Sequence, residues 1–249
     1  MQGAEDAWIA LLEECIEAGE KCGLAKVNET ASDLKDTLHR VAEQLRTDPI
    51  AVGDTVLTYS TMTAAYYAIV KNPNDLTNAT EMLNNLVNRD NLTAVAEYFS
   101  GQYEDLQTSN EALWAIKCGD TTARASDIEG IMDSVEYAME SSPSFGAIQP
   151  VIAAICAQWP FEAKERYTGD FRTKTPNPVL FVGNTYDAAT AIGSAYGMSE
   201  LFDGSIVLEQ KGFGVSSASL HSPSVALILT CQLARVYRAE IGVYVQGYP

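Results

Sequence analysis

Apolar residues recur at helical spacing through the first part of the chain. In the first segment they lie at positions i, i+3, i+4, i+7 and i+8, on one face of a helix. These residues are Trp8, Leu11, Leu12, Cys15 and Ile16. A second segment repeats the pattern and opens with Thr30 to Asp33, a weak form of the capping box. Its apolar residues are Leu34, Leu38, Val41 and Leu45.

The rest of the first 165 residues also favours helices and contains little strand signal. The pattern predicts further helices at residues 58–71, 78–88, 91–103, 109–117, 125–140 and 145–157. We therefore expect residues 1–165 to form a helical region.

The pattern changes near residue 165 to strand, helix, strand and helix. The apolar run Val179 to Val182 ends at Gly183 and is typical of a strand buried on both faces. A helix stopped at Gly204 follows, then a second strand at "SIVLEQ" and a last helix at "SPSVALILTCQLARVY". This order predicts a right-handed crossover between two parallel strands, in a second region of residues 166–249.

Charge excludes some partners. The 33 acidic and 16 basic residues give a net charge of −17, which repels nucleic acid and anionic lipid, and no apolar run is long enough to span a membrane. The first residues, "MQGAEDAW", carry no signal-peptide pattern, and we expect a natural N-terminal portion to be missing from this chain.

Other features predict an extracellular origin. Three glycosylation sequons begin at Asn28, Asn78 and Asn91, although any one of them could arise by chance. Five cysteines accompany them. Together these features favour a secreted protein.

Three motifs carry a resemblance to a known family. "CAQWP", "VLFVGNTYD" and "VLEQKGFG" resemble the C-terminal region of secreted α/β-hydrolases of the tripeptidyl aminopeptidase-like group, relatives of the prolyl aminopeptidases. The resemblance is strong over residues 156–217, moderate at 8–25 and 112–120, and weak between them. It implies a helical cap in residues 1–165, followed by the last strand-helix-strand-helix of the parallel α/β core.

The family uses a Ser-His-Asp triad to release amino acids or short peptides from a free N-terminus. The resemblance assigns Asp187 as the acid of the triad; the alternative is a loop aspartate that caps the next helix. Ala188 and Ala191 stand where the family tends to have prolines. At the family's histidine position this chain has Val215, which cannot transfer a proton.

The serine is missing as well. The sequence contains no G-x-S-x-G motif, and Ser194 lies in a string of the wrong spacing inside a predicted helix. His221 is a weak candidate to replace the histidine, and His39 is expected on a helix surface. Neither histidine has zinc-ligand spacing and "GFG" lacks the lysine of a phosphate loop, so we expect no metal and no cofactor.

The resemblance also implies two disulfides, Cys15 with Cys22 and Cys118 with Cys156. Cys231 is left over, and we interpret it as a buried free thiol rather than a nucleophile. In the family, acidic residues of the cap can hold the α-ammonium group of a substrate, but the sequence does not select one.

Two functions therefore stay open. The chain is either the cap and C-terminal part of a truncated or degenerate serine exopeptidase, or a non-catalytic interaction module built on the cap. A peptide or small-molecule substrate belongs to the first alternative. In the second, a missing hydrolase half or self-association covers the open edge of the sheet.

Overall fold

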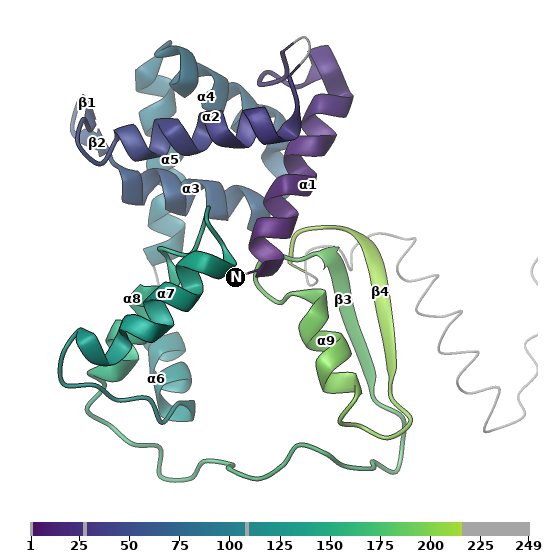
Figure 1. Ribbon diagram of the computed structural model, residues 1–249. Helices are drawn as coiled ribbons and strands as arrows, with labels where there is room; N and C mark the ends of the chain where they lie inside the picture. The colour runs from purple at the N-terminus through teal and green to yellow at the C-terminus, as the bar shows by residue number, and fades with distance from the viewer. Residues whose placement is uncertain (1, 27–28, 108–109, 216–249) are drawn as a thin grey trace, which may run out of the picture.

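The computed structural model describes residues 2–26, 29–107 and 110–215. Figure 1 shows a helical body formed by α1 to α5, a smaller group formed by α6 to α8, and a sheet with one helix, α9. The helices of the body are α1 (Gln2–Ala18), α2 (Ala31–Gln44), α3 (Tyr59–Lys71), α4 (Leu76–Asn88) and α5 (Leu92–Gln107). Short 3₁₀ turns at Gly19–Lys21 and Pro73–Asp75 follow α1 and α3.

The predicted helix starts are found where threonine can cap them. The Thr30 side chain accepts a hydrogen bond from the Asp33 N–H, and the Asp33 carboxylate accepts one from the Thr30 N–H, so the capping box before α2 is confirmed. The same reciprocal pair forms between Thr58 and Thr61 at the start of α3. Satisfying the first N–H groups in this way fixes where both helices begin.

The core of the body is aromatic at its centre. Trp8 is 1% exposed and stacks on Tyr66, with 5.4 Å between the ring centres. Phe145, from the chain between α7 and α8, meets the Trp8 ring edge-on at 6.2 Å. This contact ties the second helical group to the first.

The expectation of little strand before residue 165 missed a hairpin. Strands β1 (Ile50–Val52) and β2 (Thr55–Leu57) pair antiparallel, with Val52 opposite Thr55. Three-residue strands are too short for a period-two pattern to stand out in the sequence.

The second helical group consists of α6 (Asn110–Asp120), α7 (Met132–Ser141) and α8 (Gln149–Ala157). The expected helix 125–140 begins later, because Glu129–Ile131 forms a separate 3₁₀ turn before α7. The expected helix 145–157 also begins later, with Pro150 in its first turn, where a missing N–H costs nothing. The α8 helix packs against both α6 and α7.

The predicted parallel pairing of two strands joined by a helix is confirmed. Strands β3 (Leu180–Tyr186) and β4 (Ile206–Phe213) are parallel, and α9 (Ile192–Ser199) connects them and packs on both. Three predicted boundaries were wrong. The helix expected to stop at Gly204 ends at Ser199. The chain continues as strand through Gly183, and β4 runs on through Lys211 and Gly212, so the turn starts only at Gly214.

The β3 strand is less buried than its apolar run predicts. Leu180, Phe181 and Val182 are half-buried, because among the described residues β3 pairs with β4 alone and α9 covers only part of the sheet. The predicted last helix lies outside the described residues.

A long connecting segment, residues 158–179, joins α8 to β3 (Figure 1). It contains one isolated bridge, between Thr173 and Phe202. None of the helices in the described ranges is long and apolar enough to cross a membrane.

Candidate active site

Asp187 follows directly on β3 and is almost completely buried, at 1% exposure. Its Oδ1 accepts hydrogen bonds from the N–H groups of Ala189 at 2.9 Å and Thr190 at 2.8 Å, and its Oδ2 accepts one from the Thr190 hydroxyl at 2.7 Å. The helix α9 begins after Ala191 and has no side-chain cap. The Asp187 side chain therefore shapes its own loop. It does not cap α9, which was the alternative interpretation.

Val215 lies at the same end of the sheet. β4 leads into Gly214, whose φ of +87° is a left-handed conformation that favours glycine. The Gly214 N–H donates to the Tyr186 carbonyl at 3.1 Å, and its own carbonyl accepts from Asn184 Nδ2 at 2.8 Å. Asp187 follows β3 directly, and Val215 follows β4 after the turn at Gly214. Both residues are thus held at the carboxyl edge of the sheet, where parallel α/β sheets carry their sites.

The helical body closes over this edge. The Val215 N–H donates to the Lys71 carbonyl at the end of α3, at 3.3 Å, and the Tyr67 hydroxyl donates to the Ala188 carbonyl at 3.4 Å. Burial raises the pKa of Tyr67, and the negative charge of Asp187 raises it further. Tyr67 therefore stays a neutral phenol beside the Asp187 loop.

The start of α1 presses on the same loop. A Cβ atom on Gly3 would lie 2.6 Å from Ala191 Cβ and 2.9 Å from the Asp187 carbonyl oxygen. Only glycine allows α1 to approach the loop this closely. The acid loop is thus supported from α1 and α3, which are far from it in the sequence.

At Asp187 and Val215 the described part of the chain supplies a hydrogen-bond acceptor, and Val215 is not a base. A buried carboxylate with a fixed orientation can accept a hydrogen bond from an imidazole and stabilise the imidazolium ion. The isopropyl group of Val215 can neither donate nor accept a proton. Ser194 is an exposed residue inside α9, so its predicted position within a helix is confirmed.

The structure describes one of the two histidines. His39 is about half exposed on α2, with its Nε2 3.9 Å from Glu43 Oε1, so the prediction of a surface position is confirmed. His221 and Cys231 lie outside the described residues. In the described ranges, no group of three His, Cys, Asp or Glu side chains is placed to hold a metal ion.

Both predicted disulfides are confirmed. Cys15 at the end of α1 is bonded to Cys22, and Cys118 of α6 is bonded to Cys156 of α8. The second bond fixes α8 against α6 over a sequence separation of 38.

Two of the three sequon asparagines are described. Asn78 is exposed in the first turn of α4, and its Nδ2 donates to Asp75 Oδ1 at 2.6 Å. Asn91 is exposed before α5, with a φ of +37°. Asn28 lies outside the described residues. Glycosylation at all three stays a prediction.

A second buried carboxylate was not recognised from the sequence. Glu5, on α1, is 6% exposed and makes an ion pair of 2.9 Å with Lys35. It also accepts hydrogen bonds from the hydroxyls of Ser142 and Ser144 and from the Ser144 N–H. Burial raises its pKa, but these partners outweigh burial and hold the pKa of Glu5 below its usual range. No local pattern in the sequence joins residues this far apart.

Comparison with known proteins identifies one family. Residues 142–231, a little over a third of the 249-residue chain, match the family model described as TAP-like protein, an α/β-hydrolase family. The match contains β3, α9 and β4, and with them Asp187 and Val215. It begins before residue 166, and the predicted division of the chain at that residue stays a prediction. No curated protein matches the chain.

Proposed function

We propose that this chain, whose residues 142–231 match the TAP-like protein family model, keeps the acid loop of a hydrolase without a working catalytic triad. The observation that carries the proposal is Val215. It follows the glycine turn of β4, beside the Asp187 loop, where a triad requires an imidazole.

The chemistry of the triad explains why this one residue matters. The histidine removes the proton of the serine and returns it to the leaving amine, which contributes about 10² to 10⁴ in rate. The 249 residues also contain no G-x-S-x-G motif that could present a serine. Asp187 can orient a base, but the side chain of Val215 cannot serve as that base.

The first test is reactivity toward serine-hydrolase reagents. We expect the purified chain neither to be labelled by a fluorophosphonate probe nor to hydrolyse aminoacyl or tripeptidyl nitroanilides of the Ala or Pro type. A related active hydrolase serves as the positive control. Stoichiometric labelling of the chain would overturn the proposal, and mapping the label would identify the overlooked nucleophile.

The second test asks whether Asp187 is the acid. In Val215→His, the negative charge of Asp187 should stabilise the protonated form of the new imidazole. The pKa of that imidazole should therefore rise by about one unit above the ordinary value of about 6.5. The measurement is a ¹H–¹⁵N NMR titration of the imidazole. The matched control is the double variant Val215→His/Asp187→Asn, in which the pKa should return toward its ordinary value. Equal pKa values in both variants would contradict the role of Asp187.

The reaction class and location of the family are carried over as part of the proposal. Relatives with a complete triad would release amino acids or short peptides from a free N-terminus, and acidic cap residues would bind the α-ammonium group. Two disulfides and the exposed Asn78 and Asn91 support a secreted glycoprotein. Mass spectrometry of protein secreted from eukaryotic cells would test glycosylation at both asparagines.

A second candidate function is an interaction module. The observation that favours it is the half-buried β3, which among the described residues has β4 on one edge and no strand on the other. The edge of a sheet presents a row of N–H and C=O groups that can pair with another strand. This edge therefore suits a strand from a hydrolase half or from a second copy of the chain. Light scattering of the purified chain over a range of concentrations distinguishes a monomer from a self-associating module.

A further inference from the structure

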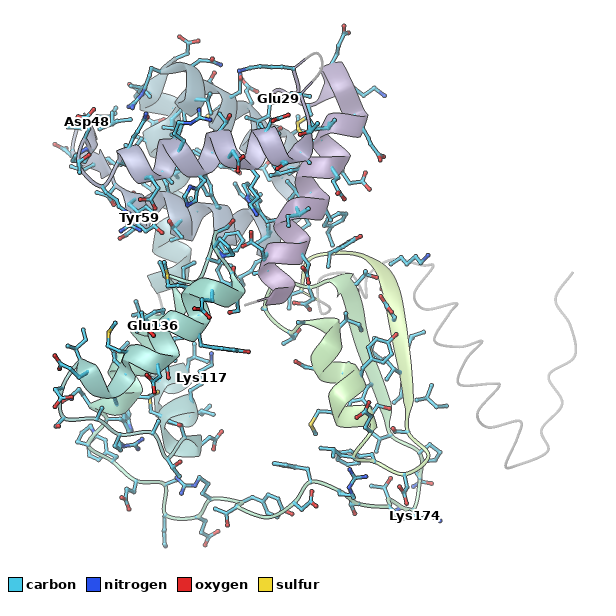
Figure 2. All side chains as sticks on the ribbon, in the orientation of Figure 1. Glu29, Asp48, Tyr59, Lys117, Glu136 and Lys174 are labelled. Atoms are coloured by element: carbon cyan, nitrogen blue, oxygen red, sulfur yellow. A yellow bond between two sulfur atoms is a disulfide. The ribbon has the colours of Figure 1, made fainter. Side chains whose placement is uncertain are left out.

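The connecting segment between α8 and β3 is exposed along most of its length. Every residue from Pro160 to Lys174 is exposed, and Figure 2 shows this stretch passing below the second helical group and reaching the sheet near Lys174. Apart from the isolated bridge of Thr173, the stretch forms neither helix nor strand. Exposed segments without secondary structure are preferred sites of proteolytic nicking.

Both ends of the exposed stretch are anchored by hydrogen bonds to the backbone. Near its start, Arg124 Nη2 donates to the Phe161 carbonyl at 3.2 Å. Near its end, the Thr173 N–H donates to the Leu201 carbonyl at 2.9 Å, and the Thr173 carbonyl accepts from the Asp203 N–H at 3.0 Å. The first anchor fixes the stretch to the second helical group and the second fixes it to the sheet.

The middle of the stretch has no such anchor. Within the part of the chain that the structure describes, the backbone N–H and carbonyl groups of residues 162–169 make no hydrogen bond. A protease binds several residues on each side of the cleaved bond in an extended form, so the backbone of its substrate has to be free. Residues 162–169 meet this condition without any loss of the described hydrogen bonds.

The unanchored middle also carries two basic side chains, Lys164 and Arg166. Neither makes an ion pair or a side-chain hydrogen bond to another described residue. Four basic and three acidic residues lie in residues 160–174, whereas the whole chain has 16 and 33. Proteases of the trypsin type bind a basic side chain through an aspartate in their specificity pocket. The local charge therefore suits a protease of this class.

We propose that the connecting segment is a processing site, cleaved after Lys164 or Arg166 by a protease specific for basic residues, and that the two products stay together as a two-chain protein. Water adds across the peptide bond, which gives one product a new carboxyl terminus and the other a new amino terminus. The proposal needs no catalytic triad in this chain, so it is independent of the proposed function.

Noncovalent contacts hold the two parts of the chain together across this cut. Both described disulfides lie before the connecting segment, so neither of them joins the products. The buried core of the helical body includes Ala188, and Tyr186 and Phe213 pack against it. The Val215 N–H also donates to the Lys71 carbonyl. Because these contacts lie away from residues 162–169, cleavage leaves them intact.

Limited digestion of the full chain with trypsin tests the site. The protein is kept at about 1 μM, where mass action disfavours a second copy that could cover the segment. Mass spectrometry of samples taken over time locates the first cut, which we expect after Lys164 or Arg166. Cuts after Lys117, Arg172 or Lys174 should be at least ~10-fold slower, because each of these residues lies in or beside hydrogen-bonded backbone.

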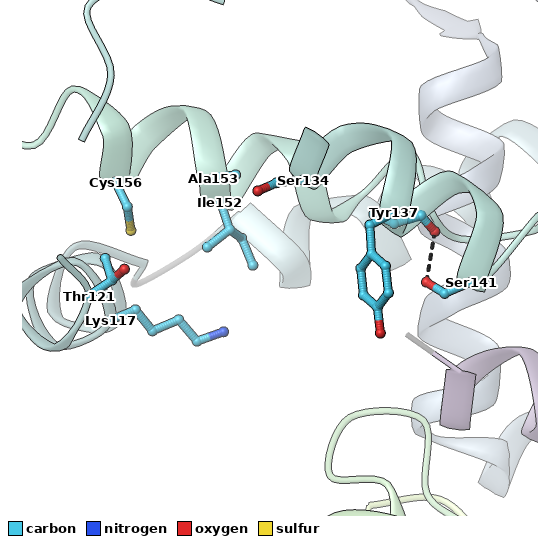
Figure 3. Close-up of a pocket in the computed structure, with 9 residues that line it drawn as sticks. Lys117, Thr121, Ser134, Tyr137, Ser141, Ile152, Ala153 and Cys156 are labelled. Carbon is cyan, nitrogen blue, oxygen red and sulfur yellow. Dashed lines mark hydrogen bonds between the residues drawn. The ribbon is translucent and has the colours of Figure 1, made fainter. Parts of the chain in front are cut away.

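Lys117 is an internal control for side-chain exposure. Figure 3 shows its side chain extending freely from α6, and it is exposed, but its peptide bond lies inside the helix. Rapid cleavage there would show that exposure alone directs the protease.

Two double variants separate the unanchored lysine and arginine from the anchored pair. Lys164→Gln/Arg166→Gln should slow nicking of the segment about ten-fold or more. Arg172→Gln/Lys174→Gln is the matched control, with the same change of charge in the same segment, and should leave the rate unchanged. Circular dichroism checks that both variants are folded.

Size-exclusion chromatography tests the second part of the proposal. The nicked protein should elute as one species under native conditions and separate into two fragments in denaturing electrophoresis without reductant. The proposal is overturned if the segment is not cut, if Lys117, Arg172 or Lys174 is cut as fast, if the control variant protects as strongly, or if the fragments elute apart.

Discussion

At the scale of single residues, the two buried carboxylates differ in what holds them. The Asp187 carboxylate accepts hydrogen bonds from Ala189 and Thr190 of its own loop, so these hydrogen bonds form whenever that loop forms. Glu5 is satisfied by Lys35 and by the chain at Ser142 and Ser144, so it depends on three distant segments coming together. Glu5 therefore stabilises the packing of the body, whereas the hydrogen bonds of Asp187 to Ala189 and Thr190 stabilise its own loop.

This difference predicts a stability effect at Glu5. Glu5→Ala should lower the free energy of unfolding by about 2 kcal/mol, because it leaves the Ser142 hydroxyl buried without an acceptor and Lys35 without its ion pair. The exposed neighbour Asp6 provides the control, and Asp6→Ala should stay within about 0.5 kcal/mol of the wild type. Urea unfolding measures both, and equal effects would show that Glu5 has no structural role.

The pKa of Glu5 gives the same residue a pH signature. Because its pKa in the folded protein lies below the ordinary value of 4.5, its contribution is fully present above that value and is lost as the pH falls through the folded pKa. The stability difference between wild type and Glu5→Ala should thus shrink below about pH 4.5. Urea unfolding at a series of acidic pH values checks this. A difference that stays constant down to pH 2 would contradict the direction of the shift.

At the scale of elements, the contact between α1 and the acid loop predicts two glycine substitutions of opposite sign. Gly3→Ala should destabilise the protein by about 1 to 3 kcal/mol, because the added Cβ would overlap Ala191 Cβ and the Asp187 carbonyl. Gly193→Ala, in α9, should stabilise it by up to about 1 kcal/mol, since nothing lies within 4 Å of the added Cβ and alanine favours helix. Thermal unfolding compares the two.

Helix propensity alone predicts a different effect of Gly3→Ala on stability. Since Gly3 also lies in a helix, propensity would make both substitutions stabilising. A rise in Tm for Gly3→Ala would show that α1 does not approach the Asp187 loop as described. The pair therefore tests a tertiary contact and not the strength of a helix.

The sequence predicted those elements whose signal is local. The stripe around Trp8, the box at Thr30 and the apolar run before Gly183 each indicated an element that the structure contains. Gly183 was read as the end of the strand because it has no side chain, yet the strand continues where Ile192 of α9 packs against it; a Cβ there would lie 2.7 Å from Ile192 Cδ1. This reason is tertiary and leaves no local pattern.

The candidate site divides in the same way. Asp187 and the position of Val215 could be assigned because motifs next to them resemble a family. The Glu5 cluster could not be assigned, since it joins α1, α2 and the chain before α8, whose relative placement no local spacing encodes.

At the scale of the whole molecule, the connecting segment leaves apolar surface uncovered. Phe161 is 67% exposed, Tyr167 65% and Phe171 54%, and they lie on the segment that leads into the half-buried β3. An aromatic side chain offers about 150 to 250 Å² for burial, so the three rings expose roughly 300 Å² or more. The largest apolar patch of a typical monomer is about 300 to 600 Å² and is often functional. Tyr167 and Phe171 contact each other, with 5.2 Å between their ring centres.

This surface predicts self-association through the segment. The average mass of the purified chain, measured by light scattering, should rise above the 26.9 kDa of a monomer as its concentration increases. Replacing Phe161, Tyr167 and Phe171 with serine should shift the equilibrium toward the monomer by about ten-fold or more, because the segment then has little apolar area to bury.

The control variant also removes exposed apolar side chains, but it removes them from outside the connecting segment. Val56→Ser/Ile128→Ser removes side chains that are 48% and 63% exposed and lie outside the connecting segment, and it should leave the mass unchanged. If it lowers the mass as much as the aromatic variant, association is nonspecific. If the wild type stays monomeric up to about 100 μM, the prediction of self-association is wrong, because the three exposed rings would then have no affinity for a second copy.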